Sequence, residues 1–283
     1  MSRIAYVSGR YLPHRQAAVH IEDRGYQFAD GVYEVIALAD GRLIDEGRHL
    51  ERLHRSLSEL RIEPPVGDAA LKIVMREVMR RNGVNNGIVY LQITRGVAPR
   101  DHAFPKSAKP VLVVTSRRSK PANPALGLDG IAVITIPDIR WQRCDIKSVS
   151  LLPNILGKQQ AREAGAYEAW QVDRDGFVTE GTSTNAWIVT RDGEVVTRAC
   201  DHAILSGITR LAMLDIIAYE GLKLVERPFS VAEAKAAREA FLTSTTAELL
   251  PIVSIDGETV ANGKPGSFAA RLHEEYQSRT ADA

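Results

Sequence analysis

The sequence has few cysteines, little net charge and no long hydrophobic run. Cys144 and Cys200 are its only cysteines, too few for a disulfide framework or a zinc cluster. The first residues form no apolar signal core, and no later run approaches the roughly 20 apolar residues of a membrane-spanning helix. We therefore expect a cytoplasmic protein. The formal net charge of +1 gives no reason to expect nucleic acid or an anionic membrane as a partner.

The signatures of several catalytic classes are also absent. The seven histidines are scattered and neither cysteine has a partner at the spacing of metal ligands, so no metal site is predicted. The sequence contains no Walker A loop, no GxGxxG loop after a strand and no GxSxG turn. Its composition, 45% hydrophobic and 25% charged, is typical of a globular protein, and its length suits one large or two modest domains.

The first 118 residues alternate between strand and helix patterns. Leucines recur every three or four residues from 50 to 60 and predict one amphipathic helix, and a second is expected over 68–83. Tyr33 and Glu34 lie in an apolar strand pattern, on opposite faces of the expected strand. The expected strands of this half are a hairpin over 4–12 and the segments 32–38, 88–94 and 110–115.

Residues 117–125 are polar and basic and contain two prolines, which is typical of a linker, and we place the linker at 119–126. They divide the chain into a small N-terminal domain, 1–118, and a larger C-terminal domain, 127–283. In the second domain we expect helices after residues 155, 205 and 230 and over 267–276. The expected strands are 130–136 and 240–242, with hairpins over 167–180, 186–197 and 252–260.

Two residues of the second half suggest covalent chemistry on a coenzyme. Lys147 lies in a segment of mainly apolar and small residues, 144–154, where lost solvation would lower the pKa of an amine and make it a nucleophile. Glu180 follows an apolar strand, and a carboxylate in such a turn can partner a pyridinium nitrogen. Each residue alone is more often an ordinary solvated or loop residue. Together they suggest a pyridoxal phosphate (PLP) site.

Other polar groups could bind the anionic parts of a coenzyme and a substrate. Arg100 and His102 stand two apart in a loop, so in an extended segment both would face one side and could share an anion such as a carboxylate. A solvated basic loop is the alternative. The glycine and hydroxyl residues of 205–210 could free N–H groups for a phosphate, or simply cap a helix. The hydroxyls of 243–246 could line an anion pocket or form a polar turn.

The chain resembles the fold-type IV PLP enzymes and, within them, the bacterial D-amino-acid aminotransferases. The resemblance covers nearly the whole length and is densest in the segments 23–35, 94–96, 140–141, 143–148, 179–181 and 243–246. It implies an α+β fold of two α/β-type domains, like that of the branched-chain aminotransferases, with the active site at the domain interface. It also implies PLP as the cofactor.

The resemblance assigns roles to particular residues. Lys147 would carry PLP as a Schiff base, Glu180 would keep the pyridinium nitrogen protonated, and Leu205 would pack against the ring. The residues implied to bind the phosphate are Arg52, Ile208, Thr209, Ser244 and Thr245. On pattern alone, Arg52 would be a solvated surface group of its helix.

The resemblance also implies the substrates and the assembly. Tyr33, Arg100 and His102 would bind the substrate carboxylate, the last two from the neighbouring subunit of a homodimer. The implied reaction is transamination between D-amino acids and 2-oxo acids, for instance D-alanine and 2-oxoglutarate. Transamination of L-branched-chain amino acids or (R)-amines, and β-elimination as in aminodeoxychorismate lyase, stay open on the same scaffold, as does a PLP-holding regulator without turnover. The carboxylate-binding set favours D-amino acids.

Overall fold

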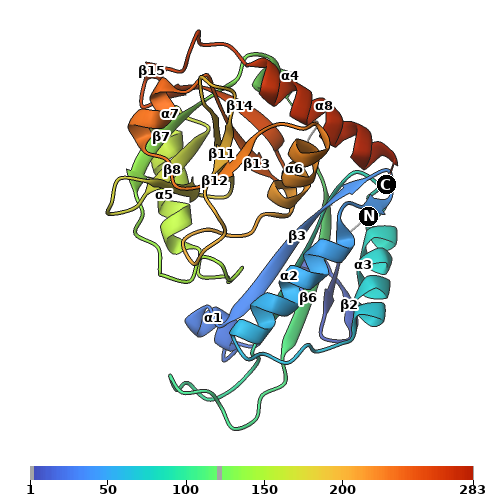
Figure 1. The fold of residues 1–283 in the computed structure, drawn as a ribbon. Coiled ribbons are helices and arrows are strands. Elements are labelled where there is room, and N and C mark those ends of the chain that lie inside the picture. The colour runs from blue at the N-terminus through green and yellow to red at the C-terminus, as the bar shows by residue number, and fades with distance from the viewer. Residues whose placement is uncertain (1–2, 120–122, 283) are drawn as a thin grey trace. The chain divides into compact units, whose positions relative to one another are not determined.

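The chain folds into two compact units, each with its own sheet. The structure, a computed structural model, describes residues 3–119 and 123–282. The first unit comprises Met1–Pro121 with Ile146–Ser150, and the second comprises Ala122–Asp145 with Leu151–Ala283 (Figure 1). Within the described ranges, no helix combines the length and the apolar character needed to cross a membrane.

The first unit is built on a six-stranded antiparallel sheet. Its strand order is β2-β1-β6-β5-β3-β4. The bounds are β1 (Ile4–Val7), β2 (Arg10–Pro13), β3 (Gly31–Ala39), β4 (Arg42–Leu43), β5 (Gly87–Thr94) and β6 (Val111–Arg118). Burial alternates along β3, so that Glu34 is fully buried on one face while Tyr33 is half-buried on the other. The predicted opposition of these two residues is confirmed.

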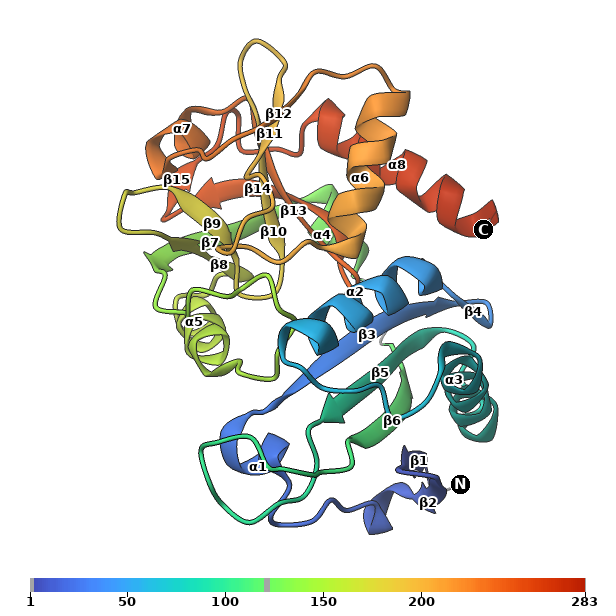
Figure 2. The same ribbon diagram turned by 60° about the horizontal axis from the view of Figure 1, so that its bottom comes forward.

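Two helices, α2 (Glu46–Glu59) and α3 (Asp68–Asn82), cover one face of this sheet (Figure 2). The leucine stripe of α2 packs there, with Leu50, Leu53 and Leu57 each at most 3% exposed. Helix α3 ends as predicted at Gly83, whose φ of +59° suits a residue without a Cβ. Two short helices, η1 (His14–Gln16) and α1 (Arg24–Phe28), were not among the expected elements.

The second unit is built on a nine-stranded sheet of mixed direction. Its order is β12-β11-β10-β13-β14-β7-β8-β9, with β15 beside β14. The pairs β14/β7, β7/β8 and β11/β12 are parallel and the others antiparallel. The bounds are β7 (Ile131–Pro137), β8 (Glu168–Val172), β9 (Val178–Gly181), β10 (Asn185–Val189), β11 (Val195–Thr197), β12 (Leu224–Glu226), β13 (Glu239–Ser244), β14 (Glu248–Ile255) and β15 (Glu258–Thr259).

The helices of the second unit pack against different strands of its sheet. Helix α5 (Leu152–Glu163) lies against β8 and β7, while α6 (Ile208–Tyr219) and α8 (Ser267–Asp282) pack on each other and on β13 (Figure 1). Helix α7 (Val231–Ala236) begins after residue 230 as expected, and Ser230 caps it, since its Oγ accepts from the N–H of Glu233 at 3.1 Å. Helix α4 (Pro124–Leu128) packs against β14.

The boundary between the units differs in two ways from the expected linker, 119–126. Helix α4 begins at Pro124, inside that range, with Asn123 as its N-cap, while 120–122 lie outside the described residues. The expected second domain, 127–283, also includes Ile146–Ser150, which the structure groups with the first unit. This short segment crosses over because its backbone pairs with β3, where Val32 and Ser148 form a β-bridge.

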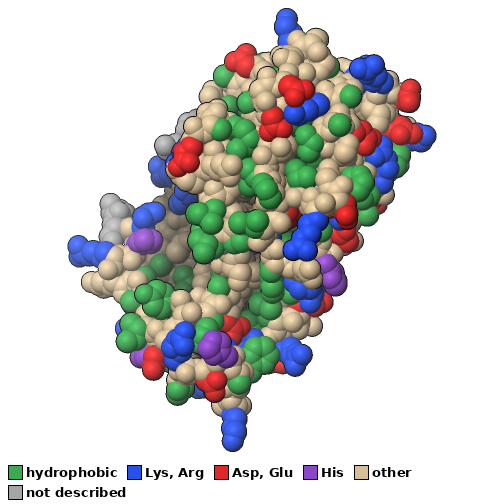
Figure 3. All heavy atoms as spheres, turned by 90° about the vertical axis from the view of Figure 1, so that its left-hand side faces the viewer, with side chains coloured by type: hydrophobic (Ala, Val, Ile, Leu, Met, Phe, Trp, Pro, Cys, Tyr) green, Lys and Arg blue, Asp and Glu red, His purple; other side chains and the backbone are tan. Residues whose placement is uncertain are grey.

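Charged side chains of both signs are scattered over the face of the molecule drawn in Figure 3, with hydrophobic side chains between them. No broad field of one sign covers this face, in keeping with the formal net charge of +1.

Candidate active site

Lys147 is fixed at the edge of β3, next to Tyr33. Its carbonyl oxygen accepts from the N–H of Tyr33 at 3.0 Å, and its own N–H donates to Ser56 Oγ at 3.2 Å. The amine lies over the Tyr33 ring, with Nζ 4.4 Å from the ring centre. Tyr33 stacks in turn on Tyr90, whose ring centre is 5.9 Å away. The structure therefore brings together two of the predicted residues, a lysine with a fixed backbone and the tyrosine beside its amine.

Arg52 is not the solvated surface group that the helix pattern alone would favour. It is 8% exposed, and its Nε and Nη2 donate to the two carboxylate oxygens of Glu34, each at 2.8 Å. His49 Nδ1 lies 2.8 Å from the same carboxylate. Burial would raise the pKa of Glu34, but the charge and hydrogen bonds of Arg52 and the contact with His49 lower it to about 2. An ionised, buried Glu34 therefore orients the arginine expected to bind phosphate.

The loop after β5 holds the side chains of Arg100 and His102 close to one ring. Both residues are exposed. Arg100 Cζ lies 4.9 Å from the centre of the Phe28 ring, and the His102 ring centre lies 5.5 Å from it. The sequence predicted that the two side chains face the same side of an extended segment; the chain instead bends at both residues, and the two side chains share a contact with Phe28.

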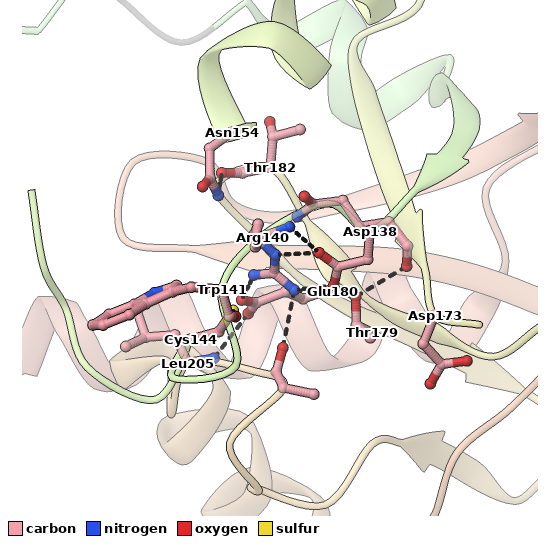
Figure 4. Close-up of polar contacts among 12 residues, drawn as sticks. Asp138, Arg140, Trp141, Cys144, Asn154, Asp173, Thr179, Glu180, Thr182 and Leu205 are labelled. Carbon is pink, nitrogen blue, oxygen red and sulfur yellow. Dashed lines mark hydrogen bonds and ion pairs between the residues drawn. The ribbon is translucent and has the colours of Figure 1, made fainter. Parts of the chain in front are cut away.

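In the second unit, Glu180 is a buried carboxylate held by three donors. Arg140 Nη1 donates to its Oε1, and the N–H of Leu205 donates to Oε2 at 3.1 Å (Figure 4). Asn185 Nδ2 also donates to Oε2, at 3.0 Å. Burial raises the pKa of Glu180 to about 6, against the Arg140 charge and the Leu205 N–H, which lower it. The carboxyl group is therefore ionised at neutral pH, with its orientation fixed by its neighbours.

Arg140 itself is fixed by further contacts in the same cluster. Its Nε and Nη2 donate to Asp138 at 3.0 and 2.7 Å, and Nη2 also donates to Thr179 Oγ1 and to the carbonyl oxygen of Ala203 (Figure 4). Burial would lower the pKa of Arg140, but the two carboxylates outweigh it and raise the pKa. The guanidinium thus stays charged beside Glu180 whatever the pH of the solution.

The start of α6 offers backbone donors where a phosphate was expected. Gly207 is the N-cap residue and no side chain caps the helix, while Ile208 and Thr209 are 3% and 2% exposed. A Cβ on Gly207 would lie 2.0 Å from Asn185 Oδ1 and would displace the amide that bonds Glu180. The first N–H groups of a helix have no partner within it, and the helix dipole favours an anion at this end.

The predicted run of hydroxyls, 243–246, does not form one continuous turn. Thr243 and Ser244 end β13, and Ser244 pairs across to Glu248 at the start of β14. Ser244 Oγ accepts from the N–H of Ala247 at 3.1 Å, which shapes the tight connection that contains Thr245. Ser244 and Thr245 are both partly exposed. Thr243 is instead buried, and its Oγ1 accepts from Trp187 Nε1 at 3.0 Å.

Comparison with known proteins settles the family. The family model described as amino-transferase class IV matches residues 31–255. A relative, the D-alanine aminotransferase of Bacillus licheniformis, is 42% identical over 272 residues, which cover 96% of this chain and 95% of that protein. The chain belongs to the class IV aminotransferases.

Solved structures agree with this class IV aminotransferase in fold. The branched-chain amino acid aminotransferase from Escherichia coli superposes with a TM-score of 0.89 at 22% identity, covering 99% of this chain and 95% of that one. The branched-chain amino acid aminotransferase from Thermobaculum terrenum, in its PLP-form, gives 0.85 at 21% identity, covering 99% and 94%. The expected α+β fold, like that of the branched-chain aminotransferases, is confirmed.

Four residues that were not predicted as site residues contact the predicted ones. Glu34 and His49 form a cluster with Arg52, and Arg140 and Asn185 form a cluster with Glu180. Glu34 carries a usable signal, because a carboxylate on the buried face of a strand needs a charged partner. For Arg140 no local pattern points to Glu180, which lies 40 residues further along the chain.

In the part of the chain that the structure describes, no three His, Cys, Asp or Glu side chains are grouped to hold a metal ion. Cys144 lies in the cluster around Arg140, and burial raises the pKa of its thiol to about 12. A thiol that stays protonated is a poor nucleophile and a poor metal ligand.

Proposed function

We propose that this class IV aminotransferase is a PLP-dependent enzyme that transfers amino groups between D-amino acids and 2-oxo acids. The observation that carries the proposal is the 42% identity to a D-alanine aminotransferase over 96% of the chain. D-Alanine with 2-oxoglutarate, giving pyruvate and D-glutamate, is the reaction we expect to be efficient. The residues described above supply a chemical role for each part of this reaction.

The donor set of each unit fits a different part of PLP. In the second unit, the fixed carboxylate of Glu180 suits a protonated ring nitrogen, and Leu205, whose N–H bonds that carboxylate, is partly exposed and would pack against the ring. The open N–H groups of Ile208 and Thr209 suit a phosphate, to which Ser244 and Thr245 would add hydroxyls. In the first unit, Lys147 offers an amine and Arg52 a guanidinium. When bound, PLP withdraws electrons from the substrate Cα.

The protein's own groups would orient the substrate and move its proton. Lys147 Nζ would accept the proton from the substrate Cα, and the Tyr33 ring beside it limits the directions in which the amine can extend. Glu180 would hold a proton on the ring nitrogen, and Arg140 keeps that carboxylate ionised. Tyr33, Arg100 and His102 would bind the substrate carboxylate and so decide which face of Cα meets the lysine.

A panel of amino donors tests the substrate class. The purified protein, loaded with PLP, is mixed with D-alanine, L-leucine or an (R)-amine, and the absorbance of the coenzyme is followed. We expect D-alanine to convert the coenzyme at least tenfold faster than L-leucine. A tenfold rate difference corresponds to about 1.4 kcal/mol in activation free energy, which a modest misplacement of the substrate carboxylate can cause. Conversion by L-leucine but not by D-alanine would instead assign a branched-chain enzyme.

The proposal includes a homodimer, in which Arg100 and His102 serve the substrate of the neighbouring subunit. Helix α5 exposes Leu152, Ile155 and Leu156 by 67%, 59% and 55%. These residues lie three or four apart and so share one face of the helix, a surface typical of a subunit interface. We propose that a second copy of this chain covers it.

Sedimentation equilibrium tests the homodimer. We expect a species of twice the 31.1 kDa chain mass, and a shift toward the monomer in Ile155→Asp, because a charge would enter an apolar interface. Leu128→Asp on α4, where the leucine is 77% exposed, is the matched control and should stay dimeric. A monomer at micromolar concentration of the unchanged protein would exclude this assembly.

A further inference from the structure

A buried arginine lies beneath the loop that carries Arg100 and His102. Arg24, at the start of α1, is 3% exposed. Its Nη1 donates to the carbonyl oxygens of Asp101 and Ala103 at 2.6 and 3.3 Å, and its Nη2 donates to that of His102 at 3.4 Å. One guanidinium group therefore bonds to three consecutive carbonyls of the loop, although 77 to 79 residues separate them from it in the sequence.

The guanidinium of Arg24 is itself held in place by a shared carboxylate. Asp30 Oδ2 accepts from Nε of Arg24 and from Nε of Arg95, each at 2.8 Å, and Asp30 Oδ1 accepts from Arg95 Nη2 at 3.0 Å. Arg95 also donates to the carbonyl oxygens of Leu60 and Arg61, at the end of α2, at 2.7 and 3.0 Å. The loop is thus tied through two arginines and one aspartate to the helix layer of the first unit.

The same short helix supports the exposed side chains of the loop. Phe28, in the last turn of α1, contacts both Arg100 and His102, and Arg24 Cζ lies 4.8 Å from its ring centre. Arg100 and His102 are exposed, so contacts with α1 rather than burial limit their freedom. A long side chain that is not held loses rotamer entropy when it binds a ligand, which weakens binding.

We propose that Arg24 is a positioning residue for the substrate carboxylate: it fixes the loop backbone, and thereby Arg100 and His102, without touching the substrate. This inference rests on the proposed function, in which those two side chains bind the carboxylate. A purely structural role for Arg24 would lower the amount of active protein instead. The two roles differ in which kinetic constant changes.

Arg24→Lys separates these roles by steady-state kinetics. Lysine keeps the positive charge beside Asp30 but cannot reach three carbonyls with a planar fork. We expect KM for D-alanine and for 2-oxoglutarate to rise about tenfold, as for the loss of one charge-assisted hydrogen bond, while kcat stays within about threefold. Arg117→Lys, an exposed arginine on β6, is the matched control and should change neither constant. Unchanged KM values, or a fall in kcat alone, would overturn the proposal.

Backbone amide exchange reports on the loop without any activity. In Arg24→Lys, exchange over 98–106 should be at least about tenfold faster than in the unchanged protein, with the rest of the first unit unaffected. Equal exchange in the two proteins would show that Arg24 does not fix the loop. If the unchanged protein fails to convert D-amino acids, the proposed function fails, and this measurement still decides whether Arg24 holds the loop.

Mixed dimers locate the effect in one chain. The Arg24→Lys and Lys147→Ala proteins are refolded together to form mixed dimers. In a mixed dimer, only the Arg24→Lys chain has Lys147, and its active site takes the loop of the other chain, which retains Arg24. We expect this site to show the KM of the unchanged protein, because the loop serves the neighbouring subunit. A KM as high as that of the Arg24→Lys homodimer would mean that the loop serves the active site of its own chain, and would reject the sharing of this loop between subunits.

Discussion

Lys147→Ala is expected to abolish transamination, with turnover at least about 10⁴-fold below that of the unchanged protein. In the proposed function this amine both holds the coenzyme and takes the proton from the substrate Cα, so no remaining group can replace it. Alanine keeps the backbone contacts of the residue, since the bonds to Tyr33 and Ser56 use its carbonyl oxygen and N–H. The measurement is pyruvate formation from D-alanine and 2-oxoglutarate.

The control for this loss is a lysine outside the site. Lys72→Ala, on α3 with a side chain 41% exposed, should leave turnover unchanged. Borohydride reduction of the PLP-loaded protein should attach the coenzyme to the peptide that contains Lys147, and attachment should disappear in Lys147→Ala. Residual turnover above roughly 1%, or attachment to another lysine, would reject the assignment of Lys147.

Elements defined by local pattern could be predicted from the sequence. The leucine stripe of α2 predicts its buried face, and the hairpin expected over 167–180 is the pairing of β8 with β9. These signals work because a helix or a hairpin is decided by residues within a few positions of each other. Helix α1 lacks such a signal: it has only five residues, which are too few for a helical repeat, and one of them is glycine, a poor helix former.

The clusters of the site join residues far apart in the chain, and these could not be read from the sequence. Glu34 contacts Arg52 across 18 residues, Glu180 contacts Arg140 across 40, and Arg24 reaches Asp101 across 77. Each pair contains a buried charged side chain, which needs a hydrogen-bond partner. The sequence can indicate that a partner is needed, but it does not indicate which residue provides it. The placement of Lys147 beside Tyr33 likewise depends on a backbone pairing between segments far apart in the chain.

Glu180→Gln is expected to lower turnover roughly 10²- to 10³-fold, the usual effect of removing one group that stabilises charge in the reaction. A glutamine has nearly the same shape, and the N–H of Leu205 can still donate to its side-chain oxygen. It carries no negative charge, however, and so cannot keep a proton on the ring nitrogen. The fold should survive, because Arg140 retains its bonds to Asp138.

The pH dependence of turnover gives this prediction a second measurement. Burial raises the pKa of Glu180 to about 6, and the ionised form is the active one. A protonated ring nitrogen beside the carboxylate would lower this pKa further, so turnover of the unchanged protein should decline only at or below pH 6, where the carboxyl group takes up a proton. Glu180→Gln should lack this decline because it has no group to titrate there. Glu258→Gln, with a side chain 67% exposed, is the matched control and should keep both the rate and the pH profile. If Glu180→Gln retained the rate and the acid decline of the unchanged protein, Glu180 would have no part in the chemistry and the role of Arg140 beside it would be structural.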